Sequence, residues 1–235
     1  MNTTLSLSDA IDQLLAEDKI AGLPAWEGTP LGFTSRYYSA ADLDAAAERR
    51  ALVDATKPWH DRTQHGWRAD YCGVRAQFGT HTIATYTADT RCLWDYHQLQ
   101  EGQRPRLVSE RIPCECIGGL LHLIVCDTCE LHWIHEDENA VVEAWNDHAY
   151  PGWRNLPILP AKLRGQMGTR KMTPKLEEWF EANYPAQFHV PGAPILTDRG
   201  GSGTRHVPEY SPYGGYDIAV DGIQTPPAVL SQGAP

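Results

Sequence analysis

The sequence has no uninterrupted run of about 18 apolar residues, the length that a membrane-spanning helix requires, so we expect no such helix. Residues 1–10 have neither the basic nor the apolar region of a secretory signal, and we expect none. Cysteine is scarce, with six in 235 residues. Paired thiols in a chain without an export signal bind metals more often than they form disulfides. These absences predict a cytoplasmic protein with no membrane partner.

Positively charged residues are also fewer than negatively charged ones. The chain has 20 Lys and Arg against 30 Asp and Glu, which gives a formal net charge of −10 at pH 7. This balance disfavours nonspecific binding to nucleic acid or to anionic membranes. Apolar residues are plentiful at 42%, with eight Trp, and a chain of this length can therefore bury a substantial core.

Four of the cysteines follow the pattern Cys114-x-Cys116-x9-Cys126-x2-Cys129. The apolar run 120–125 separates the two pairs and predicts a hairpin strand, and a predicted helix follows over 138–149. Two cysteine pairs joined by a hairpin and closed by a short helix suit a tetrahedral metal site. The pattern therefore predicts a structural Zn²⁺ bound by all four thiolates.

Two alternatives stay open at this stage. In the first, a histidine replaces one cysteine ligand. The nearby candidates for that role are His122, His132 and His135. In the second, the four cysteines are reduced core residues, an arrangement disfavoured by the polar Glu115 between the first two. We interpret Cys72 and Cys92 as isolated buried thiols, with a second metal site as the alternative.

The patterns together predict an α+β protein, with a small mixed β region, a zinc-ribbon hairpin, a capping helix and an irregular C-terminal arm. The expected segments are an N-terminal helical segment (1–56), a β-rich region (57–112), the zinc ribbon with its capping helix (113–157), a helical segment (158–184) and an extended or disordered arm (185–235). The arm holds eight Pro and eight Gly, with few long apolar runs.

Helices are expected over 9–20, over 40–55 after the capping residue Ser39, over 138–149 and from Thr173 onward. Thr173 is followed by Pro174, a pair that typically starts a helix. Strands are expected over 67–74, 81–86, 106–112, 120–125 and 130–134.

The order of a cysteine pair, Cys126-x2-Cys129, then Ala144-Trp145-Asn146 resembles the phage zinc-ribbon family typified by the Lar restriction-alleviation proteins. The first pair is shorter than in that family, and the glycine that follows the second pair there is missing here. The resemblance implies a metal-stabilised module of phage or mobile-element origin, without a catalytic mechanism. More broadly, the chain resembles uncharacterised proteins of actinobacteria and their phages, through Gly203-Thr-Arg-x-Val-Pro and Ser211-Pro-x-Gly-Gly-Tyr-Asp217.

Charge changes sign abruptly along the chain. Residues 130–153 contain six acids and no Lys or Arg, whereas residues 154–176 contain six bases and no acid. We favour the interpretation that the basic stretch docks on the acidic helix of the same chain. The alternative is contact with phosphates. Its candidate residues are Lys162, Arg164, Arg170 and Lys171. The glycine-rich run 199–206 is interpreted as a linker, with an anion-binding nest as the alternative.

The chain shows no convincing catalytic motif. Asp147-His148-x2-Pro151-Gly152-x2-Asn155-Leu156 resembles an HNH nuclease, but the second metal-binding histidine and the trailing cysteine pair are missing. We therefore expect a non-catalytic zinc-binding phage or mobile-element protein that binds a host component, countering restriction or nucleic-acid processing. A direct nucleic-acid-binding zinc ribbon and an HNH-like nuclease are the alternatives.

Overall fold

The computed structural model describes residues 37–56, 68–69, 73–89, 120–164, 173–200, 203–206 and 211–223. These residues fall into two units. The first unit contains the described residues 38–56, 68–69, 87–89 and 120, and the second contains 37, 73–86 and those from 121 onward. The helix predicted over 9–20 and the strand predicted over 106–112 lie outside the described residues.

The first unit is built on helix α2, Ala40–Ala55, which has the predicted bounds. The Ser39 hydroxyl accepts a hydrogen bond from the Asp42 N–H at 3.1 Å, and the Asp42 carboxylate accepts one from the Ser39 N–H at 3.1 Å. This reciprocal pair is a capping box, which satisfies two backbone donors at the helix start. Leu43 is buried, and α2 contacts the short strand β1, Arg68–Ala69.

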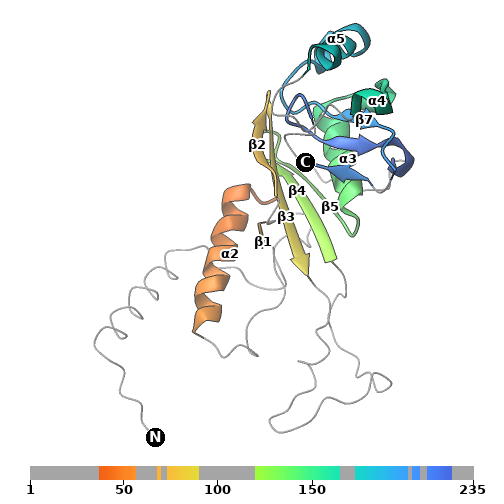
Figure 1. Cartoon of the computed structure of the whole chain (residues 1–235). Coiled ribbons are helices and arrows are strands. Elements are labelled where there is room, and N and C mark those ends of the chain that lie inside the picture. Colours follow the sequence, from red (N-terminus) through yellow and green to blue (C-terminus); the bar gives the residue numbers. More distant parts are fainter. Residues whose placement is uncertain are drawn as a thin grey trace, which may run out of the picture. The chain divides into compact units, whose positions relative to one another are not determined.

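Two antiparallel hairpins form most of the larger sheet (Figure 1). Their strands are β2 (Arg75–Phe78), β3 (His81–Asp89), β4 (Leu120–Cys126) and β5 (Leu131–His135). The sheet order is β1-β3-β4-β5, and β2 also pairs with β3. The β4–β5 hairpin matches the expected strands 120–125 and 130–134 to within one residue, and its register sets Cys126 opposite Leu131.

Helix α3, Glu138–Ala149, has the predicted bounds and contacts β5. Its start is capped by the Asp137 carboxylate, which accepts a hydrogen bond from the Asn139 N–H at 2.9 Å. The helix buries Val141, Val142 and Trp145, residues at three- and four-residue spacing that face the core. The mixture of helices and antiparallel strands confirms the α+β class.

The interpretation that the basic stretch 154–176 docks on the acidic helix holds for its first base, Arg154, whereas Arg164 pairs with Asp198 instead. Arg154, in the 3-10 helix η2 (Trp153–Asn155), forms ion pairs with Glu143 and Asp147, each at 2.8 Å. The Glu143 side chain is only 1% exposed. Because a buried carboxylate without a partner is costly, Arg154 stabilises this helix in its packed position.

A second, four-stranded sheet lies in the second unit. Its strands are β6 (Ile158–Leu159), β7 (Ile195–Thr197), β8 (Thr204–Arg205) and β9 (Asp217–Ala219), in the order β6-β7-β9-β8. The first three in that order are parallel, and β8 is antiparallel to β9.

Short helices accompany this sheet, namely α4 (Ala161–Arg164), α5 (Pro174–Asn183) and the 3-10 helices η3 (Ala186–Phe188) and η5 (Val220–Gly222). Helix α5 begins as predicted, because the Thr173 side chain accepts a hydrogen bond from the Leu176 N–H. Leu176 and Phe180 are buried, and Trp179 packs partly buried against the core. The described residues of the segment 158–184 therefore supply two helices and the short strand β6.

The described part of 185–235 differs from the extended arm that its composition predicts. It supplies β7, β8 and β9, and Ile195 and Ile218 are fully buried. Pro191, Gly192, Pro212 and Gly214 lie in turns between these very short strands, and the strands pair with partners distant in the sequence. Composition alone does not show such pairing, because no single strand is long enough to give a periodic signal.

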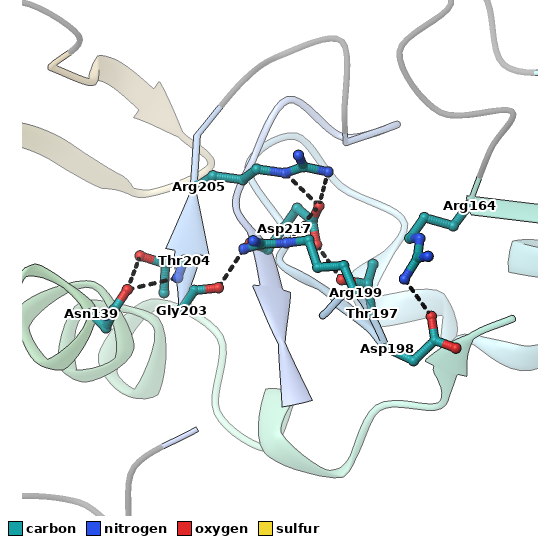
Figure 2. Close-up of polar contacts among 9 residues, drawn as sticks. All are labelled: Asn139, Arg164, Thr197, Asp198, Arg199, Gly203, Thr204, Arg205 and Asp217. Carbon is teal, nitrogen blue, oxygen red and sulfur yellow. Dashed lines mark hydrogen bonds and ion pairs between the residues drawn. The ribbon is translucent and has the colours of Figure 1, made fainter. Parts of the chain in front are cut away.

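A buried carboxylate joins these strands (Figure 2). Asp217 is fully buried; it accepts a hydrogen bond from the Thr197 hydroxyl at 2.6 Å and forms ion pairs with Arg205 at 2.7 Å and Arg199 at 3.3 Å. Arg199 and Arg205, which lie near the two ends of the glycine-rich run, thus stabilise the fold through their ion pairs with Asp217. The Asn139 side chain of α3 accepts a hydrogen bond from the Thr204 N–H at 2.7 Å, which ties α3 to β8.

Replacement of Ile218 by Ala should lower the free energy of unfolding by about 2–5 kcal/mol, because it leaves a cavity in the core. The matched control is Ile158→Ala, since Ile158 is 48% exposed and its truncation should cost less than about 1 kcal/mol. Urea unfolding followed by circular dichroism measures both changes. Equal, small effects would mean that β9 is not part of the folded core.

Candidate metal centre

Four side chains that can ligate a metal ion converge in the second unit. They are His81, Cys126, Cys129 and His148, and one ligand atom from each lies within 4.8 Å of all the others. The His81 Nδ1 lies 3.4 Å from the Cys129 Sγ and 3.9 Å from the Cys126 Sγ. Two sulfur and two nitrogen donors at this spacing form a set that can hold a metal ion.

The two cysteines come from the turn of the β4–β5 hairpin. Cys126 ends β4, and the Cys129 N–H donates to the Cys126 carbonyl oxygen at 3.3 Å, so that a tight turn brings the two sulfurs together. Glu130 follows with a left-handed φ of 53°, at the position where the Lar-type sequences carry glycine. A non-glycine residue in this conformation costs about 1–2 kcal/mol. The turn therefore forms without the glycine, at some cost in strain.

His81 begins β3, directly after the turn of the β2–β3 hairpin. The next residue fixes it against the cysteines, because the Thr82 hydroxyl donates to the Cys126 Sγ at 3.9 Å and accepts from the Thr128 N–H at 3.2 Å. The Trp145 indole N–H of α3 donates to the Thr82 carbonyl oxygen at 3.2 Å. The fully buried Trp145 thus places its indole N–H at a backbone carbonyl of β3. It also positions the strand that carries His81.

His148 lies in the last turn of α3. Its ring contacts the His81 ring edge to face, with centroids 4.6 Å apart, and the Trp133 ring at 5.3 Å. Its Nε2 is buried and has no hydrogen-bond partner among the described residues. Burial, with the nearby His81, lowers the pKa of His148 and favours the neutral imidazole that metals bind. A bound metal ion suits this environment, in which a ring nitrogen lacks a partner.

The two thiols are free rather than joined in a disulfide. Burial raises the pKa of the Cys129 thiol, and the hydrogen bond and charge of the adjacent Cys126 raise it further. The pair is therefore a poor place for two thiolates unless a cation offsets their charge. Four protein ligands also fill a tetrahedral coordination sphere, so this donor set favours a structural ion over one that activates water.

The structure brings together two of the four predicted cysteine ligands. Cys126 and Cys129 meet as expected, whereas Cys114 and Cys116 lie outside the described residues. The other two positions of the cluster are histidines, which the four-cysteine prediction did not include. The hairpin histidines that were weighed as alternatives take no part in the cluster. They are His122, His132 and His135.

Sequence reasoning missed His81 and His148 as ligands because neither lies at a zinc-ribbon spacing from the cysteines. His81 precedes Cys126 by 45 positions, and only the pairing of β3 with β4 brings the two together. His148 lies on the same face of its helix as Trp145 and Val141, and this position directs it at the hairpin. A search for histidines on that face of the predicted helix would have found His148.

The basic residues proposed to bind phosphates divide between described and undescribed parts of the chain. Lys162 and Arg164 lie in α4, and Arg164 forms an ion pair with Asp198 at 2.7 Å (Figure 2). Arg170 and Lys171 lie outside the described residues. The structure therefore does not gather these four residues into one described basic patch.

Fold and site together define an α+β protein with a candidate metal centre of two cysteines and two histidines. The chain belongs to a family of unknown function (DUF6349), whose family model matches residues 28–228. No curated protein matches the chain, and no solved structure does. Among the described helices, none combines the length and the apolar character needed to cross a bilayer.

Single replacements Cys126→Ser and His148→Ala should each release the bound metal and loosen the packing of α3 on the hairpin, because each removes one of four bonds. The double change Cys114→Ser with Cys116→Ser is the matched control and should retain the metal. Elemental analysis of the purified variants, with circular dichroism to follow folding, measures both. Loss of metal from the control with retention in His148→Ala would favour the four-cysteine site.

Proposed function

We propose that the ion held by this centre is Zn²⁺. Zinc bonds of about 2.3 Å to sulfur and about 2.0–2.1 Å to nitrogen, at tetrahedral angles, place sulfur and nitrogen roughly 3.6 Å apart. The distances from the His81 Nδ1 to the two sulfurs, 3.4 and 3.9 Å, lie on either side of that value. A mixed sulfur and nitrogen set with no open position is also the donor set typical of structural zinc.

We further propose that the protein is a non-catalytic binding protein, and that its zinc fastens the hairpin to α3. The observation that carries this proposal is the closed set of four ligands, drawn from β3, the β4–β5 turn and α3. Such a site stabilises a surface rather than performing a reaction. The proposed partner is a host component of restriction or nucleic-acid processing, and this part of the proposal rests on the resemblance to the Lar-type proteins. The proposed compartment is reducing and cytoplasmic, and this part rests on the paired thiols.

The nuclease alternative uses the same histidine in a different role. In that hypothesis His148 activates water, whereas here its ring contacts His81 and Trp133 beside the cysteines. The neighbouring Asp147 is engaged as well, since it accepts hydrogen bonds from the Trp153 indole at 2.8 Å and from Arg154. These contacts are those of residues that stabilise the packing of the C-terminal end of α3. The contacts therefore favour the structural role of His148.

Purified, metal-loaded protein should cleave neither DNA nor RNA when Mg²⁺, Mn²⁺ or Zn²⁺ is supplied, and it should capture a specific protein from host lysate. Incubation with plasmid DNA and with single-stranded RNA tests the first part, and affinity capture with mass spectrometry tests the second. Metal-dependent cleavage that His148→Ala abolishes would refute the binding-protein proposal.

The second candidate function is direct binding of nucleic acid. It is favoured by the exposed Lys162, which shares a surface groove with Lys175. Phosphate contacts would make this binding strongly dependent on salt. Neutralising Lys162, Arg164, Arg170 and Lys171 together should then reduce the affinity for DNA or RNA at 50 mM salt by at least about tenfold. Filter binding or polarisation measures this affinity, and no detectable binding of the unmodified protein at low salt would eliminate this candidate.

A further inference from the structure

A surface groove lies between α4 and α5, and none of its lining residues belongs to the metal-binding cluster. One wall comes from the residues around α4 and the other from one face of α5. The lining residues are Pro160, Lys162, Leu163, Lys175, Glu178, Trp179, Ala182 and Asn183. The zinc proposal does not use this groove, and two of its lining residues, Leu163 and Trp179, also pack against the edge of the core.

The apolar part of the groove lining includes Trp179, whose ring packs against other aromatic rings. The Trp179 ring packs against the Phe180 ring with centroids 5.2 Å apart and against the Tyr184 ring at 5.7 Å, and both of these neighbours are buried. Trp179 itself is only partly buried and lines the groove together with Leu163. A large aromatic ring held in place by its neighbours loses little conformational entropy on binding, and Trp is enriched at the energetic centres of protein interfaces.

The rim of the groove has the opposite sign of charge to the protein as a whole. Lys162 and Lys175 are both exposed and line it, with Glu178 as the one acid of the lining. The chain as a whole carries a net charge of −10. Complementary potentials across an interface steer encounter and select the partner. The charges here select an acidic partner with a limited number of carboxylates, since Glu178 opposes a longer run of negative charge.

We infer that this groove docks an acidic peptide segment of a protein partner, one in which an apolar side chain is flanked by carboxylates. The apolar side chain rests on Trp179 and Leu163, and the carboxylates pair with Lys162 and Lys175. This inference rests on the proposed binding function and names the chemistry of its partner. A nucleic acid strand is the competing class of ligand, and the acid in the lining disfavours its continuous phosphates.

A fluorescein-labelled peptide of sequence Asp-Glu-Leu-Phe-Asp-Glu, followed by polarisation at 50 mM salt, tests the inference. The full chain should bind it, and Lys162→Gln combined with Lys175→Gln should weaken binding by about three- to tenfold, because exposed ion pairs are individually weak. Trp179→Ala should abolish detectable binding. Glu178→Gln should tighten binding by about twofold, since it removes the opposing charge.

The matched control is Gln187→Glu, which adds one negative charge unit, as each single lysine replacement does, at an exposed position outside the groove. It should leave the affinity unchanged. The inference is overturned if the full chain does not bind the peptide, if the double lysine variant binds as well as the full chain, or if a 15-nucleotide oligo-dT binds more tightly than the peptide. The lysine and glutamate variants alter only exposed side chains, so they remain informative if Trp179→Ala does not fold.

Affinity capture with the same variants separates this inference from the proposed function. A captured protein that is lost with the double lysine variant supports both. A captured protein that is retained by that variant leaves the binding function standing and refutes the groove as its site. If the unmodified chain captures no protein, the proposed function fails, whatever the result with the peptide.

Discussion

The second unit depends on the meeting of four ligand side chains where three elements converge. His81 comes from β3, the cysteines from the β4–β5 turn and His148 from α3. Without an ion, this region would hold two adjacent thiols and a buried imidazole nitrogen that has no partner in the described part of the chain, which is an unfavourable environment. With an ion, the same side chains become bonds between segments far apart in the sequence. A metal ion bound there would cross-link the hairpin and its covering helix.

The contacts around the cluster support the same arrangement. Thr82 is bonded from both sides, by the Thr128 N–H of the turn and by the Trp145 indole of α3. Trp145 is fully buried, so its position is fixed by packing as well as by the hydrogen bond. Residues that orient metal ligands in this way limit the motion of the ligands and thereby favour metal binding. The same helix reaches the second sheet through Asn139 and Thr204, which joins the metal centre to the C-terminal strands.

The sequence predicts the features that depend on neighbouring residues. The bounds of α2 and α3, the start of α5 and the strands of the hairpin all follow from capping residues and apolar periodicity. The knuckle formed by Cys126 and Cys129 follows from its spacing. His81 could not be predicted, because its distance from the cysteines is closed only by strand pairing. The C-terminal sheet was missed for a similar reason, since strands of two or three residues give no periodic pattern.

The most direct test of the account is the X-ray absorption spectrum of the protein purified without added metal, recorded at the zinc edge. The account predicts one zinc per chain, with about two sulfur neighbours near 2.3 Å and two nitrogen neighbours near 2.0–2.1 Å, the nitrogens showing the outer-shell scattering of imidazole rings. A shell of four sulfurs would show that Cys114 and Cys116 complete the site in place of the histidines. Protein that folds fully with no bound metal would contradict the central claim.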